Sequence, residues 1–103
     1  PWEKAKAFNG SAFVSSMMPF DSVILDKPIH FTLHKNGELV QDGNSELMIW
    51  NVAELIEEVS KYFTLKTGDY LFTGTPAGVG PVAIGDVLTG ALEGSHLFEL
   101  AIS

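Results

Sequence analysis

Apolar and polar residues alternate strictly over residues 29–34, which is the two-residue period of a β-strand. The dipeptide Asn36-Gly37 follows, and both of its residues tolerate the positive φ angles that a type I′ turn requires. Beyond the turn, a return strand continues through Gln41. The pattern therefore predicts a β-hairpin over residues 29–41 that is closed by a type I′ turn.

Residues 51–63 carry the one strong helical pattern of the chain. Apolar side chains recur there at spacings of three and four residues, which places them on one face of a helix. These positions are Val52, Leu55, Ile56, Val59 and Phe63. Asn51 can cap the helix, and Glu54, three residues later, completes a variant of the capping box. The charged residues are expected to face water: Glu54, Glu57, Glu58 and Lys61.

The pattern Gly-Asp followed by Thr-Gly occurs twice after this helix, in residues 65–74 and 83–92. Gly-Asp favours a tight turn that leads into a strand, so we predict a strand in both segments. Gly94 indicates one more turn, into a last strand over residues 95–103. Near the start of the chain, the small and apolar residues 11–20 are predicted to form an extended, buried segment. Together these elements describe a β-rich α+β fold with one main helix.

The composition fits a single globular domain over residues 1–103. Hydrophobic residues make up 46% of the chain and charged residues 18%, proportions that separate it from disordered segments. The chain contains no Cys, which excludes disulfides and thiolate metal sites. We expect a cytoplasmic protein, or a mitochondrial one in a eukaryote.

The charge balance narrows the possible partners. The formal net charge is −7, and all six basic residues are Lys, whereas a nucleic-acid-binding domain needs a basic patch and usually Arg. No apolar run approaches the roughly 18 residues of a membrane-spanning helix. We therefore expect neither nucleic acid nor a membrane as a partner. An anionic substrate remains compatible, because local backbone N–H groups can hold one despite the overall charge.

Residues 72–81, with the sequence FTGTPAGVGP, combine three glycines with two threonines and two prolines. A phosphate-binding loop would need Lys-Ser/Thr after its last glycine, and Pro81 stands there instead. Two interpretations remain open. The segment is either a simple turn between strands, or a nest of N–H groups and the Thr73 and Thr75 hydroxyls that holds a carboxylate or an enolate oxygen.

Two lysines and three histidines are further candidates for chemistry. Lys4 and Lys6 lie beside Trp2 and Phe8, where a lysine is either a surface residue covering a ring or a half-buried cation suited to polarising a carbonyl group. The histidines are His30, His34 and His96. Because they fall on predicted strands, the His-x-x-x-His spacing of helical zinc sites does not apply, and we interpret them as solvated.

The order of four motifs resembles the fumarylacetoacetate hydrolase family. The motifs are WEKAKAFN, NGELVQDGNSELMIW, FTLKTGDYLFTGTPAGVGP and GDVLTGALEG, and the resemblance covers nearly all of the 103 residues. The match is to the C-terminal part of the catalytic domain. It implies a β-roll of mixed sheets, and a Mg²⁺- or Mn²⁺-dependent enzyme that acts on small 2-oxo or β-dicarbonyl acids. Such enzymes hydrolyse, decarboxylate or isomerise their substrates through an enolate, and the branch of acylpyruvate hydrolases, oxaloacetate decarboxylases and hydroxymuconate isomerases is the most similar.

The resemblance also implies roles for individual residues. The family's active-site lysine corresponds to Lys6, which is expected to polarise a substrate or metal-bound oxygen. Thr75 is expected to bond the substrate carboxylate, and Gly74 to let the backbone approach the ligand. Gln41 and Ser45 match a run that we interpret as structural. The chain departs from the family at Asn9, where Asp is common, and at Ala12-Phe13, where relatives often have Cys-Pro.

The family's metal ligands, a Glu-x-Glu pair and a separate Asp, precede the matched region, as does its general-base histidine. No Glu-x-Glu occurs in this sequence. We therefore expect the chain to be a C-terminal fragment of a longer catalytic domain, to hold no metal and to be inactive alone. We also expect a homodimer or an intertwined assembly, since strands that lack partners expose their edges. The alternative is a non-catalytic binding or structural module that keeps the fold.

Overall fold

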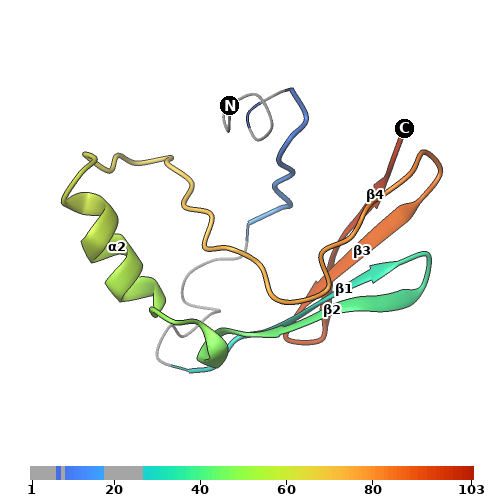
Figure 1. Cartoon of the computed structure of the whole chain (residues 1–103), viewed down its shortest axis with the longest axis horizontal. Helices are drawn as coiled ribbons and strands as arrows, with labels where there is room; N and C mark the ends of the chain where they lie inside the picture. The colour runs from blue at the N-terminus through green and yellow to red at the C-terminus, as the bar shows by residue number, and fades with distance from the viewer. Residues whose placement is uncertain (1–6, 8, 18–26) are drawn as a thin grey trace.

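The computed structural model describes residue 7, residues 9–17 and residues 27–103. Its centre is one sheet of four antiparallel strands in the order β2-β1-β3-β4 (Figure 1). The strands are β1 (His30–Lys35), β2 (Glu38–Asn44), β3 (Val87–Leu92) and β4 (Ser95–Ala101). A short 3-10 helix η2 (Ser45–Leu47) and the helix α2 (Val52–Ser60) follow β2. The predicted α+β, strand-rich fold is thus confirmed.

Both hairpins of the sheet close through the turn that the sequence favours. Asn36 and Gly37 have φ angles of 53° and 82°, so the predicted turn between β1 and β2 is confirmed with both central residues at positive φ. Glu93 and Gly94, at 51° and 78°, repeat this arrangement between β3 and β4. The left-handed Glu93 is held by the neighbouring strand, because its backbone N–H donates to the carbonyl oxygen of His30 at 2.7 Å.

The helix is capped as predicted but is shorter than predicted. The Glu54 N–H donates to Asn51 Oδ1 at 2.8 Å, and the Asn51 N–H donates to Glu54 Oε1 at 3.2 Å, which forms the complete capping box. The helix ends at Ser60, whereas the apolar pattern predicted that it would continue to Phe63. The Phe63 N–H still donates to the Val59 carbonyl oxygen at 3.0 Å, but its side chain is 70% exposed among the described residues, so packing does little to extend the helix.

The strand predicted over residues 65–74 is absent, and this prediction was wrong. The repeated pattern sets only the turn: Asp69 Oδ2 accepts from the Lys66 N–H and Asp86 Oδ2 from the Ala83 N–H, both at 2.8 Å. Only the second turn leads into a strand, because β3 finds β1 and β4 as neighbours. Residues 65–74 have no such neighbour in the described part of the chain, so they run as an irregular connection from α2 back to the sheet (Figure 1).

The predicted burial of residues 11–20 was also wrong for its described part, and residues 18–20 lie outside the described residues. Phe13 is 47% exposed and Met17 74% exposed. The Phe13 ring does rest on Phe98 of β4, edge to face, with 5.0 Å between the ring centroids. Among the described residues no hydrophobic side chain is fully buried, so the sheet and α2 enclose no core between them.

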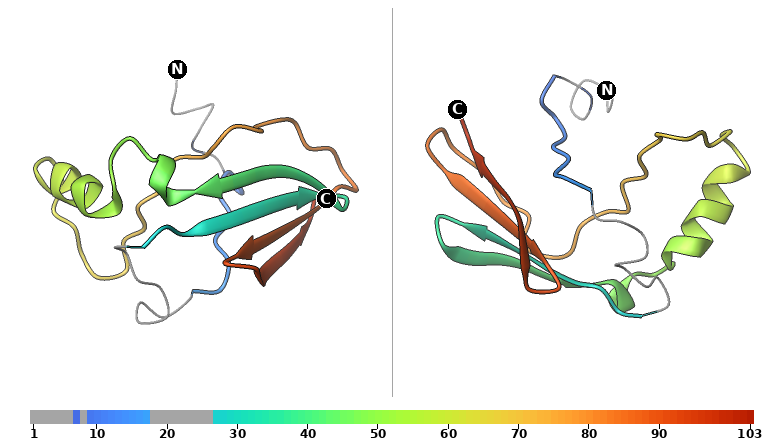
Figure 2. Two further views of the ribbon diagram at one scale, coloured as in Figure 1. Left: turned by 90° about the horizontal axis from the view of Figure 1, so that it is seen from below. Right: turned by 180° about the vertical axis from the view of Figure 1, so that it is seen from behind.

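Figure 2 shows the reason for the missing core. From below and from behind, α2 stands beside the end of the sheet and does not cover either of its faces. The apolar face of α2 therefore stays accessible, with Ile56 43% exposed. In the described part of the chain no helix has the length and apolar character needed to cross a membrane.

Candidate functional site

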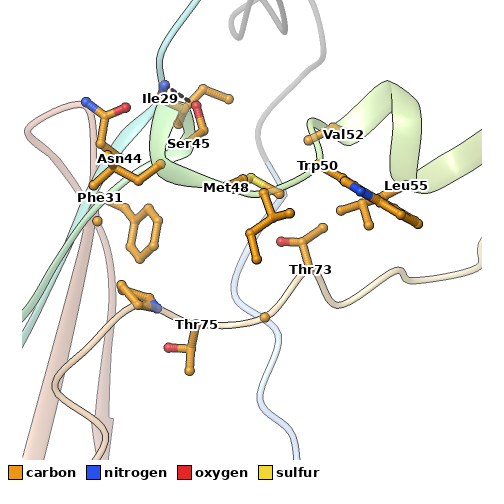
Figure 3. A pocket seen from close by; sticks show the side chains of 15 residues that line it. Ile29, Phe31, Asn44, Ser45, Met48, Trp50, Val52, Leu55, Thr73 and Thr75 are labelled. Carbon is orange, nitrogen blue, oxygen red and sulfur yellow. Dashed lines mark hydrogen bonds between the residues drawn. The ribbon is translucent and has the colours of Figure 1, made fainter.

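An open, mostly apolar pocket of about 660 Å³ lies where the start of β1, the segment from η2 to α2, and residues 73–76 come together (Figure 3). Its apolar lining comes from Ile29, Phe31, Met48, Trp50, Val52 and Leu55, among others. Its polar lining comes from Asn44, Ser45, Thr73 and Thr75. Among the described residues, none of those that line the pocket is charged.

Residues 73–76, within the segment 72–81, form one wall of this pocket and bring two of the predicted site residues, Gly74 and Thr75, to it. Gly74 has a φ of 93°, and no atom of the described residues lies within 4 Å of the place where a Cβ would be built. Glycine is therefore required here for the backbone conformation, and it leaves open space beside the loop. Figure 3 shows the Thr73 side chain directed toward Met48 and Trp50, and the Thr75 side chain directed away from Phe31 and Met48.

The Thr75 hydroxyl is held from the sheet by Gln41 of β2. The Gln41 side-chain amide donates from Nε2 to Thr75 Oγ1 at 2.8 Å and to the Pro76 carbonyl oxygen at 3.1 Å. Residues 34 positions apart are thus joined. The sequence placed Gln41 in a structural run but carried no local signal for this contact. Ser45, from the same run, accepts the Ile29 N–H at 2.7 Å and closes the base of the hairpin.

The loop is fixed to the hairpin at two further points. Gly78 has a φ of 107° and lies so close to β2 that a Cβ would stand 2.0 Å from the Val40 carbonyl oxygen. Lys35 Nζ donates to the Pro81 carbonyl oxygen at 3.4 Å. Residues 75–81 are therefore held against the hairpin of β1 and β2 by specific contacts.

The end of this connection is held by a polar clamp at the first hairpin turn. Asn36 Nδ2 donates to Asp86 Oδ1, and Asn36 Oδ1 accepts from the Val87 N–H, both at 2.9 Å. The hydrogen bond from Asn36 lowers the pKa of the Asp86 carboxyl, and the Ala83 N–H and the charge of Lys35 lower it further, while the loss of solvation opposes them. The clamp joins the end of the loop to the hairpin turn.

Two lysines and His30 are further candidates from the sequence. Lys6 and Lys4 lie outside the described residues, so their positions relative to Thr75 stay a prediction. On the sheet, the His30 ring is hydrogen-bonded to the Asp42 carboxylate of the neighbouring strand and remains half-exposed. Among the described residues, no three His, Asp or Glu side chains are grouped so that they could hold a metal ion.

Comparison with known proteins places this arrangement in a family. The family model for the fumarylacetoacetate (FAA) hydrolase C-terminal domain matches residues 1–100. An oxaloacetate tautomerase of Escherichia coli (strain K12) is 45% identical over 98 residues, which are 94% of this chain and 45% of the relative. A fumarylacetoacetate hydrolase family protein from Yersinia pestis CO92 superposes with a TM-score of 0.93 and 42% identity over 100% of this chain and 49% of that one.

A third relative was solved with ligands. The fumarylpyruvate hydrolase from Pseudomonas aeruginosa, in complex with Mn²⁺ and pyruvate, has a TM-score of 0.68 and 37% identity over 73% of this chain and 32% of that one. The chain spans about half the length of the E. coli and Y. pestis relatives. Its motifs, its sheet and these similarities agree, and the chain belongs to the fumarylacetoacetate hydrolase C-terminal family.

Proposed function

We propose that this chain is the C-terminal part of a longer, divalent-metal-dependent catalytic domain that acts on small 2-oxo or β-dicarbonyl acids through an enolate. The observation that carries the proposal is the fitted loop of residues 72–81, in which Thr75 is held by Gln41 beside the open space at Gly74. An ordinary connecting turn needs no such attachment. A hydroxyl held in one place is suited to donating a hydrogen bond to a substrate carboxylate.

The described residues do not offer a donor set for Mg²⁺ or Mn²⁺. Such ions take several oxygen ligands, mostly carboxylates, and these would have to come from another part of the complete protein. The Mn²⁺ and pyruvate in the P. aeruginosa relative support both the metal and the 2-oxo acid. The contribution of this chain would be to bind and orient the substrate.

Within that role, each residue has a distinct task. Thr75 would hold the carboxylate, and Gly74 would leave space for it because it lacks a side chain. Lys6 would place a positive charge at the oxygen where negative charge develops. Hydrolysis, decarboxylation and tautomerisation would all share the stabilisation of an enolate. The relatives are named for hydrolysis and for tautomerisation.

The test is an activity assay of the complete protein with Mg²⁺ or Mn²⁺, on an acylpyruvate and on oxaloacetate. We expect turnover of at least one of these acids that is lost with EDTA and restored by added metal. The 103-residue chain assayed alone should show none. Metal-independent binding of pyruvate without any turnover would favour a non-catalytic module instead.

A further inference from the structure

We propose that Gln41 is a positioning residue that sets the direction of the Thr75 hydroxyl, so that its proton is presented to the substrate carboxylate. This inference rests on the proposed function, because it requires that Thr75 binds the substrate. Gln41, which lies on β2 and outside the loop, would thereby contribute to the affinity for the substrate.

The direction of the Gln41 amide follows from its two partners. The Pro76 carbonyl oxygen can only accept a hydrogen bond, so the atom 3.1 Å from it must be the amide nitrogen and not the amide oxygen. The same nitrogen lies 2.8 Å from Thr75 Oγ1 and has a second hydrogen to donate there. The two contacts together therefore fix Gln41 as the donor to Thr75.

This polarity decides what the threonine can do. A hydroxyl has one proton and two acceptor lone pairs. Since Gln41 occupies one lone pair, the Thr75 proton is directed to some other acceptor. A substrate carboxylate is such an acceptor, because in its ionised form it only accepts hydrogen bonds. Gln41 thus selects the orientation in which Thr75 donates to an anion.

Gln41 is not the only attachment of the loop. Gly78 packs against the Val40 carbonyl oxygen, and Lys35 reaches the Pro81 carbonyl oxygen, so the loop has contacts with the hairpin on the other side of Pro76. A change at Gln41 that keeps the side-chain length should therefore alter the hydroxyl direction more than the loop position. This separates a positioning role from a purely structural one.

Two substitutions test the polarity in the complete protein. Gln41→Met keeps the length but has no N–H group, so the Thr75 hydroxyl becomes free to rotate. Gln41→Glu keeps the shape but can only accept, so it takes the Thr75 proton for itself and repels the Pro76 carbonyl oxygen. Because Thr75 would hold the carboxylate in ground and transition states alike, the effect should appear mainly in KM. We expect KM to rise by roughly threefold or more for Met and by about tenfold or more for Glu, with kcat within about threefold of wild type.

A double-mutant comparison with Thr75→Val shows whether the effect passes through the hydroxyl. In the Thr75→Val background, Gln41→Met should raise KM no further. His96→Glu, which adds a negative charge on β4 at the opposite edge of the sheet, controls for net charge and should leave KM unchanged. Thermal unfolding of each variant and pyruvate binding by calorimetry accompany the kinetics.

The outcomes separate cleanly. A wild-type protein that turns over none of the acids overturns the proposed function and this inference with it. If the wild type is active, three results would overturn the inference alone. The first is a Gln41→Glu protein with the wild-type KM, and the second is one with a lower kcat at constant KM, as a loss of folded protein would give. The third is a Gln41→Met substitution that raises KM equally with and without the Thr75 hydroxyl. If neither Gln41 variant folds, the residue is structural and the inference is also overturned.

Discussion

Single side chains of this protein hold segments that are distant in the sequence. Asn36 sits at a positive-φ turn position, which its small polar side chain tolerates, and it also bonds Asp86 and the backbone of Val87. The Gln41 side chain likewise joins distant segments, because its amide donates hydrogen bonds to Thr75 and to the Pro76 carbonyl oxygen. At the residue scale, the site therefore depends on amides that join the hairpin to the long connection that follows α2.

The Asp86 clamp predicts a pH dependence of stability. Because folding lowers the pKa of Asp86 below its ordinary 3.8, its contribution to the free energy of unfolding is present above pH 3.8 and is lost as the pH falls through the lowered pKa. Asp86→Asn should therefore lower the unfolding midpoint of the complete protein near pH 7 and have a smaller effect at about pH 2.5. Urea unfolding across this range measures it.

Asp69→Asn is the matched control, since Asp69 makes the same turn bond and has, in the described part of the chain, no partner comparable to Asn36. Near neutral pH, Asp69→Asn should lower the unfolding midpoint less than Asp86→Asn does. Equal effects of the two substitutions at every pH would show that the clamp to Asn36 adds nothing.

Lys6 gives the second prediction at this scale. If Lys6 stabilises developing negative charge, Lys6→Ala in the complete protein should lower kcat/KM at least tenfold, which is about 1.4 kcal/mol of transition-state stabilisation. Lys4→Ala changes the net charge equally and should stay within about twofold of wild type. Steady-state kinetics of both variants check the assignment, and similar losses from the two would refute it.

At the scale of elements, the hairpin of β1 and β2 is the support and residues 72–81 are the supported loop. Gly78 is the point of closest approach, with its φ of 107° and the 2.0 Å between a built Cβ and the Val40 carbonyl oxygen. A side chain at this position must push the loop away from β2. The same displacement would move Thr75 away from Gln41.

Gly78→Ala should therefore cost about 1–3 kcal/mol of stability through backbone strain and displacement, and it should raise KM as well. Gly80→Ala is the control, because its Cβ position has no atom of the described residues within 4 Å and its φ is not in the left-handed region. Unfolding curves and KM values, measured for both variants, show whether the contact between Gly78 and β2 holds the loop. An unchanged Gly78→Ala protein would mean that the loop is not held by this contact.

At the scale of the whole molecule, the chain is less compact than its length allows. Its radius of gyration is 15.0 Å, against about 13 Å for a compact domain of this length. No apolar side chain in the described part is fully buried, and large ones such as Ile49 and Ile84 are 97% and 85% exposed. Apolar surface of this extent is typical of a face that packs against another protein segment or chain.

We expect the isolated 103-residue chain, with its mass of 11.2 kDa, to associate in solution and to bind hydrophobic dyes. The complete protein should bury this surface and form a defined dimer. Light scattering of both measures the masses. A monodisperse 11.2 kDa species with no dye binding would contradict the expectation for the isolated chain.

The sequence by itself determined the local features, because these depend on neighbours in the chain. Asn36-Gly37 set the hairpin turn, Asn51 and Glu54 set the start of α2, and the order of motifs identified the family. Each is encoded within a few residues, by φ preference, by a capping hydrogen bond or by a characteristic string.

Only the tertiary structure decided which segments find a partner. Residues 65–74 and 83–92 have the same pattern and the same Gly-Asp turn, yet only the second becomes a strand, because only it lies beside β1. The segment FTGTPAGVGP gave no sign of Gln41, since that contact joins residues 34 apart. A hydrogen bond between distant residues depends on where the backbone brings them, and a local pattern carries no information about that distance.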